Sequence, residues 1–187
     1  MRKVLVFIIF FFPLGVFAQS YDEGLSHHQL GAEGSTLTGD GLTYSYIFDS
    51  VYRIKTTLWA YYQDNGGGSS NWTGSVGLEL QRTFITTENT RFYGLVGGFY
   101  FSHGNKNNSL YYVPDSSNFA SPYISTSLEH DFAAGFGVGF EVMVWKHVAI
   151  NLAVSFEYAG VTYNNPYSGN PSKYVGPGIG GGVSYRF

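Results

Sequence analysis

The residues of this chain best suited to chemistry are a histidine and a neighbouring aspartate–serine pair. His103 stands at the end of a segment with the pattern of a β-strand, and Asp115 and Ser116 lie in the long polar stretch that follows. A histidine that takes the proton of a serine hydroxyl turns that oxygen into a nucleophile. Aspartate and serine are also common in loops, where they bond to nearby backbone groups. We therefore expect a protein that is not an enzyme, and keep these three residues as the catalytic set of an alternative.

Metal and cofactor chemistry find little support in the sequence. The chain contains no cysteine, which excludes disulfides and thiolate ligands. Its glycines at 176–182 recur with a period of two and no lysine follows them, unlike a phosphate-binding loop. The formal charge is −3 without a basic cluster, so the electrostatic footprint of a nucleic-acid binder is missing. We expect no metal, no cofactor and no nucleic-acid partner.

The elements that must position any site are β-strands. From 148 to 158 every even position is large and apolar, and every odd position between them is small or polar. The same alternation runs through 132–142 and 72–80, and a period of two is that of a strand with two different faces. The pattern predicts eight strands, at about 26–36, 41–49, 51–63, 72–84, 90–103, 123–144, 147–160 and 174–187.

Composition and connections predict that the apolar faces point outwards. Aromatic residues make up 19% of the chain and charged residues only 12%, against about 25% charged in ordinary soluble domains. Short turns alternate with longer polar loops, as in outer-membrane barrels with an even number of strands. We predict an all-β fold, a transmembrane antiparallel up-and-down β-barrel of eight strands. A soluble carrier barrel is a less favoured alternative, because the same aromatic residues would then face water.

The inward faces of these strands carry charged residues. An eight-stranded barrel has room only for side chains or for one small ligand. Buried charges are costly unless they are paired, so we expect carboxylates and cations to pair and to close the lumen. The predicted lumen ion-pair cluster consists of Glu33, Arg53, Lys55, Glu79, Glu141, Glu157 and Arg186.

Aromatic residues also gather in the two longest predicted loops. Alternation between Tyr123 and Glu129 predicts that one hairpin continues beyond the membrane. An exposed strand edge with aromatic residues is a platform on which a partner can add a strand. A solvated loop with its own aromatic cluster is the alternative. The predicted binding residues are Tyr111, Tyr112, Phe119, Tyr123, Tyr163 and Tyr167.

The amino-terminal residues have the pattern of a secretory signal peptide. Arg2 and Lys3 precede an apolar run that ends at Phe12, and a small-x-small cleavage pattern ends at Ala18. The run has about half of the ~20 apolar residues that a membrane-spanning helix needs. We predict a signal peptide at 1–18 and one outer-membrane β-barrel domain at 19–187.

The carboxyl terminus carries the motif of a known class of proteins. Gly182, Tyr185 and Phe187 form a terminal strand that resembles the assembly signal of bacterial outer-membrane β-barrels. The whole predicted barrel resembles the small eight-stranded outer-membrane proteins of the OmpA/OmpX kind, and its leader resembles those of short barrels from Bacteroidetes. The resemblance implies a porin-like fold in the cell envelope of a Gram-negative bacterium. The partners it implies are outer-membrane lipid and lipopolysaccharide, the barrel-assembly machinery during biogenesis, and an envelope protein partner.

Two functions follow from these resemblances. The favoured one is a non-enzymatic barrel with a closed lumen, whose extracellular loops are structural or bind a partner, including a role as accessory subunit of an envelope complex. The alternative is a lipid-A-modifying acyltransferase or deacylase centred on His103 and Ser116. The deacylating barrels carry a His-x-Ser pair, whereas here Gly104 and Asn105 follow the histidine.

Overall fold

The computed structural model describes residues 4–5, 27–48, 51–111, 121–163 and 172–187, with the side chains of 4–5, 108–111 and 121–125 outside the description. Its regular structure within these ranges consists of strands alone. Among the residues described, no helix is long and apolar enough to cross a membrane. The strands are β1 (Val4–Leu5), β2 (His28–Ser35), β3 (Gly41–Ile47), β4 (Tyr52–Gly66), β5 (Ser69–Thr86), β6 (Thr90–Tyr111), β7 (Ser121–Trp145), β8 (Val148–Tyr163) and β9 (Ser172–Arg186).

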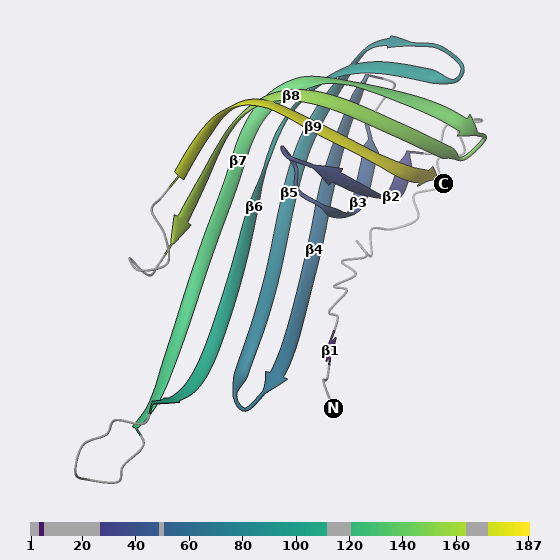
Figure 1. The fold of residues 1–187 in the computed structure, drawn as a ribbon. Helices are drawn as coiled ribbons and strands as arrows, with labels where there is room; N and C mark the ends of the chain where they lie inside the picture. The colour runs from purple at the N-terminus through teal and green to yellow at the C-terminus, as the bar shows by residue number, and fades with distance from the viewer. Residues whose placement is uncertain (1–3, 6–26, 49–50, 112–120, 164–171) are drawn as a thin grey trace.

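Strands β2 to β9 form one closed ring of eight antiparallel strands (Figure 1). Each of β3 to β8 pairs with the strand that precedes it and the strand that follows it in the chain. The ring closes where β2 pairs with β9, from Gln29 opposite Arg186 to Ser35 opposite Gly180. The predicted all-β, eight-stranded up-and-down barrel is confirmed.

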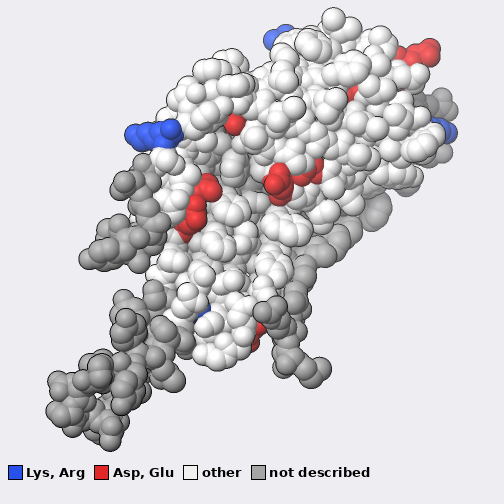
Figure 2. Space-filling model, in the orientation of Figure 1, with Lys and Arg blue, Asp and Glu red and all other residues white. Residues whose placement is uncertain are grey.

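The two faces of the ring have the opposite polarity to those of a soluble protein. Large apolar residues lie outside, where Leu152 is 62% and Phe136 64% exposed. Charged residues lie inside, where Arg53 is 3% and Glu141 4% exposed. Figure 2 shows a face that is mostly uncharged, with a few acidic groups near its middle and scattered charges toward its ends. The period of two in the sequence thus separates an apolar exterior from a polar interior.

The ring has walls of unequal height. The β2–β3 hairpin is short, and its pairing with β4 ends at Leu42 opposite Leu58. Strand β4 continues to Gly66, and β6 and β7 pair with each other as far as Tyr111 and Ser121. In Figure 1 the ribbons of β4 to β7 extend well past β2 and β3. One side of the ring is therefore low, and the opposite side is tall.

The turn between β2 and β3, residues 36–40, folds into the barrel. Leu37 is 2% exposed and packs with Tyr93 and Leu95 on the inner face of β6. Thr38 is also buried, and its hydroxyl donates to Glu33 Oε1 over 3.0 Å. The sequence predicts a brief outer loop at 38–40; the structure places this segment inside the ring because Leu37 finds apolar contacts there.

Two glycines make room for this inward packing. A Cβ added to Gly77 of β5 would overlap the carbonyl oxygen of Thr38, so only glycine admits the turn at this point. A Cβ on Gly139 of β7 would overlap the ring of Tyr93. Glycine at inward positions thus lets the turn and the tyrosine fill the narrow lumen.

Strand β1 lies within the segment predicted to be a signal peptide. It pairs antiparallel with β4, Val4 opposite Gln63 and Leu5 opposite Tyr62. These partners belong to the part of β4 that extends beyond β3. The signal peptide and the domain boundary at residue 19 remain predictions.

Candidate functional site

The half of the lumen nearest the short turns, toward the upper right in Figure 1, is called the lower half. It holds a network of ion pairs centred on Arg53. The Arg53 guanidinium binds Glu141 through two hydrogen bonds, Nη1 to Oε2 over 2.6 Å and Nη2 to Oε1 over 3.0 Å. Its Nη1 also donates to Gln29 Oε1 over 2.7 Å. Arg91 Nε lies 3.5 Å from Glu141 Oε1, and its guanidinium stacks 4.3 Å from the Tyr93 ring centroid. A planar guanidinium in this fork geometry fixes the carboxylate firmly.

A second group of charges lies above the first, around Lys55. Lys55 Nζ is 2.7 Å from Glu33 Oε2 and 3.0 Å from Glu79 Oε2. Asn151 Nδ2, on β8, donates to Glu33 Oε2 over 3.1 Å, across Gly182 of β9, which pairs with both residues. Each lone pair of these carboxylates that meets a donor lowers the cost of burying the charge.

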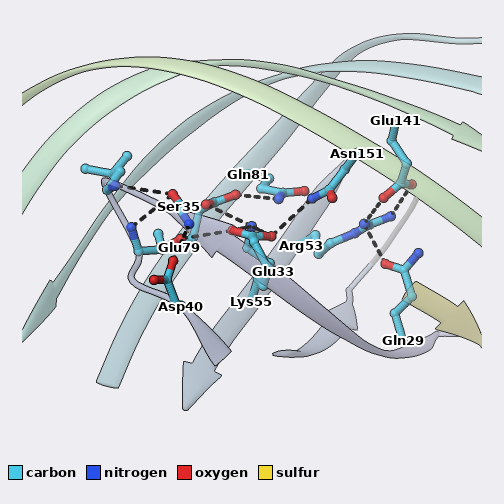
Figure 3. Close-up of polar contacts among 12 residues, drawn as sticks. Gln29, Glu33, Ser35, Asp40, Arg53, Lys55, Glu79, Gln81, Glu141 and Asn151 are labelled. Carbon is cyan, nitrogen blue, oxygen red and sulfur yellow. Dashed lines mark hydrogen bonds and ion pairs between the residues drawn. The ribbon is translucent and has the colours of Figure 1, made fainter. Parts of the chain in front are cut away.

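Gln81 links the two groups into one network, and Figure 3 shows its contact with Glu79 beside the residues around Lys55 and Arg53. Its amide nitrogen donates to Glu79 Oε1 over 2.5 Å, and its amide oxygen accepts from Arg91. Three cations, Arg53, Lys55 and Arg91, therefore face three carboxylates. The network is neutral, crosses the lumen from β2 to β7, and is capped by the turn at 36–40. What this arrangement can do chemically is hold the walls together and fill the barrel.

The structure brings together five of the seven residues predicted for the lumen cluster: Glu33, Arg53, Lys55, Glu79 and Glu141. Glu157 is buried but accepts only from Ser155, over 3.4 Å. Arg186 forms no ion pair with another described residue. Four residues outside the predicted cluster also join the network: Gln29, Gln81, Arg91 and Asn151. Arg91 shares the inward parity of Tyr93, so the alternation of β6 carries the signal that identifies it.

Of the three residues of the catalytic alternative, the described structure contains His103. His103 Nδ1 lies 2.9 Å from Thr73 Oγ1 on the inner face of β5. Asp115 and Ser116 lie outside the described residues. No group of three histidine, aspartate or glutamate side chains suited to a metal ion occurs among the residues described.

A different histidine meets a serine on the outer face of the barrel. Ser102 Oγ lies 3.1 Å from His130 Nδ1, and the hydroxyl of Tyr100 lies 2.6 Å from the same nitrogen. Both contacts fall on one ring nitrogen, and no carboxylate of the described chain is hydrogen-bonded to this histidine. The contacts tie β6 to β7, and the third group of a catalytic triad is missing.

Three of the six predicted binding residues lie at the outer ends of β6, β7 and β8. Tyr163 ends β8, where desolvation and the hydrogen-bonded carboxylate of Glu129 raise the pKa of its phenol. Tyr111 and Tyr123 lie on the backbone of β6 and β7, with side chains outside the description. Tyr112, Phe119 and Tyr167 lie outside the described residues. The long β6–β7 pairing shows that this hairpin continues, as the alternation predicts.

The residues of the predicted assembly signal lie at the end of the barrel that carries the short turns. The rings of Tyr185 and Phe187 are exposed on the outer face, stacked with centroids 6.5 Å apart. Gly182 has the opposite parity, and a Cβ there would lie 2.6 Å from the carbonyl oxygen of Ala32.

Known proteins resemble this chain only distantly. No family model and no curated protein matches it. Among solved structures, Ail, the attachment invasion locus protein of Yersinia pestis, is 16% identical, covers 87% of this chain and 97% of its own, and has a TM-score of 0.38. A major outer membrane protein of Thermus thermophilus is 13% identical over 86% and 98%, with a TM-score of 0.44. CarO2 of Acinetobacter baumannii is 11% identical over 88% and 100%, with a TM-score of 0.39. These scores are low, so the fold described above rests on the strand pairing of this chain.

Proposed function

We propose that this chain is an integral outer-membrane β-barrel protein of a Gram-negative bacterium, with a closed lumen and no enzymatic activity. The observation that carries the proposal is the inverted polarity of the ring, apolar outside and charged inside. In water the exposed apolar surface would promote aggregation. In a bilayer the same surface is solvated by lipid, and a closed ring leaves no unpaired strand edge in the hydrocarbon.

The dimensions of the ring fit this environment. A tilted strand needs about 9–11 residues to cross a bilayer, and β8 has 16. Exposed aromatic rings, including Phe48 and Tyr185, lie at the end with the short turns. Others, including Tyr100 and Tyr158, lie toward the outer end. Aromatic girdles at the two interfaces of the membrane are typical of such barrels.

Membrane fractionation of cells that express the full chain tests this proposal. We expect the protein in the outer-membrane fraction, resistant to carbonate extraction, with faster gel mobility before heating than after it. We also expect an intact mass that corresponds to a mature chain beginning at Gln19. A protein that stays soluble without detergent contradicts the proposal and favours the soluble carrier barrel.

The terminal aromatic residues support recognition by the barrel-assembly machinery. Phe187→Ala should reduce the amount of folded barrel in the membrane, because the signal loses its last ring. Phe48→Ala is the matched control, since Phe48 is an equally exposed ring at the same end of the barrel. Equal amounts of folded barrel for the two variants would remove the assignment of this signal.

Because the ion-pair network closes the lumen, we expect function at the outer end of the barrel. The tall hairpins offer strand edges and aromatic residues to an envelope partner or to lipopolysaccharide. Tagged purification in mild detergent, followed by mass spectrometry, should retain a stoichiometric partner. Alanine at Tyr111, Tyr123 and Tyr163 should remove it while the heat-modifiable mobility persists; retention of the partner would contradict this binding surface.

A further inference from the structure

A cavity of about 950 Å³ opens on the outer side of the inturned turn. Its lining consists of the end of β2, the turn itself, the start of β3, inward residues of β4 to β7, and Ile179 of β9. Leu37 and Thr38 are not part of this lining, because they are buried on the lumen side of the turn. The volume lies within the range of about 300–1,000 Å³ that is usual for small-molecule sites.

Three aromatic side chains line the cavity: Trp59, Phe99 and Phe101. Trp59 has the inward parity of β4 and yet is 47% exposed, because β3 and its turn end below it. Phe99 contacts the turn, with its ring 3.6 Å from where a Cβ on Gly39 would lie. Leu42 and Ile179, 41% and 65% exposed, lie on the outer face of the ring and add aliphatic surface at the rim of the opening. The wall therefore offers ring faces and apolar area to a ligand.

The charged residues of the lining are all acidic. They are Glu33, Asp40 and Asp131, and the part of the lining that the structure describes contains no lysine, arginine or histidine. Lys55 neutralises Glu33. Asp40 and Asp131 form no ion pair with other described residues; Asp40 Oδ1 accepts from the Ser35 backbone N–H over 3.1 Å, and Asp131 Oδ1 is buried without a hydrogen-bond partner. Two uncompensated carboxylates thus share the cavity with three aromatic rings.

The cavity is accessible from the side as well as from the outer end. Beyond Leu58, toward the outer end, β4 no longer pairs with β3. The outer part of β9 pairs with β8 and not with β2, because its pairing with β2 begins at Gly180. The low β2–β3 hairpin therefore leaves the wall between β4 and β9 without a strand of the ring; the described chain places there only β1, opposite Tyr62 and Gln63, within the predicted signal peptide. A ligand with an apolar body can enter through this opening without crossing the ion-pair network.

We propose that this cavity binds a small organic cation with an apolar body. Carboxylates attract the positive charge, and the faces of tryptophan and phenylalanine stabilise a cation within about 6 Å of the ring centroid. The aliphatic residues of the lining contact the remainder of the molecule. An anion of the same shape meets two negative charges and no positive one.

The test uses a pair of ions with the same shape and opposite charge. Tetraphenylphosphonium and tetraphenylborate are titrated by calorimetry into the full-length protein in lipid nanodiscs, with empty nanodiscs as the reference. We expect saturable binding of the phosphonium and only the background partition of the borate. Heat-modifiable gel mobility of the same samples reports whether the barrel is folded, independently of binding.

Substitutions then locate the site. Asp131→Asn and Asp40→Asn should each weaken phosphonium binding about tenfold, since a charged partner is lost, and Trp59→Leu about threefold. Glu88→Gln removes an equal charge at the opposite end, where Glu88 is exposed, and should leave binding unchanged. Equal saturable binding of both ions, absence of phosphonium binding to the folded barrel, or full binding by the Asp40→Asn/Asp131→Asn variant would each overturn the proposal.

Discussion

The lower and outer halves of this barrel use the same strands for opposite purposes. In the lower half, inward charges are paired: Arg53 with Glu141, and Lys55 with Glu33 and Glu79. In the outer half, Asp40 and Asp131 line an open cavity without such partners among the described residues. The comparison suggests two roles for charged side chains inside a barrel. Where they form ion pairs and are packed, they stabilise the fold; where the β2–β3 wall ends and ion pairs are missing, they can bind a ligand.

Breaking the lower network should have the largest effect on stability. Glu141→Leu leaves Arg53 and Arg91 buried without their carboxylate, and we expect a loss of about 3–5 kcal/mol in the free energy of unfolding. Urea titration of the refolded barrel in lipid measures it. The double variant Arg53→Met/Glu141→Leu should recover part of the loss; a stable single variant would show that the network contributes nothing.

The apolar exterior is the next most sensitive feature. Leu152→Arg places a charge at the middle of β8 on the outer face and should cost about 2–4 kcal/mol in a bilayer. Trp145→Arg, at the end of β7, should cost about 0–1 kcal/mol because it lies near the interface. Equal unfolding midpoints for the two variants would argue against a lipid-facing belt.

Displacing the inturned turn should have a smaller effect. Gly77→Ala places a Cβ against the carbonyl of Thr38, and the overpacking should cost about 1–3 kcal/mol. Gly74→Ala is the matched control, since its nearest neighbour, the carbonyl oxygen of Trp59, lies 3.9 Å away. If both glycines tolerate alanine equally in urea titrations, the turn does not pack on β5.

Substitutions in the outer half should hardly change stability. Asp131→Asn removes a carboxylate without an ion-pair partner among the described residues, so we expect a change within about 0.5 kcal/mol, measured as an unfolding midpoint. Its effect should appear in cation binding instead. A large loss of stability would mean that Asp131 belongs to the structural network and not to a binding cavity.

The alternation of the sequence was sufficient to predict the ring and much of its interior. Side-chain parity identifies Glu33, Arg53 and Glu141 as inward residues, because a strand has no other way to orient them. Arg91 has the same inward parity, but it lies at the start of its strand and is absent from the predicted cluster. Pairing partners depend on register between distant strands, and the alternation within one strand does not encode register.

The inturned segment and the cavity were beyond sequence reasoning. A single apolar residue, Leu37, in a short polar connection resembles any surface turn. Its inward packing depends on space left by Gly77, which lies far away in the sequence. The cavity arises because β2 and β3 end before β4 does, and strand ends are the part of a periodic pattern that is least sharply marked.

Cysteine accessibility tests the contrast between the two halves most directly. The natural chain has no cysteine, so Ser75→Cys in the cavity wall and Thr57→Cys in the closed lumen each provide one thiol. With the barrel in nanodiscs, a membrane-impermeant maleimide should label residue 75 rapidly and residue 57 only after unfolding in urea. Equally rapid labelling of both positions in the folded barrel would contradict a lumen that is closed below and open above.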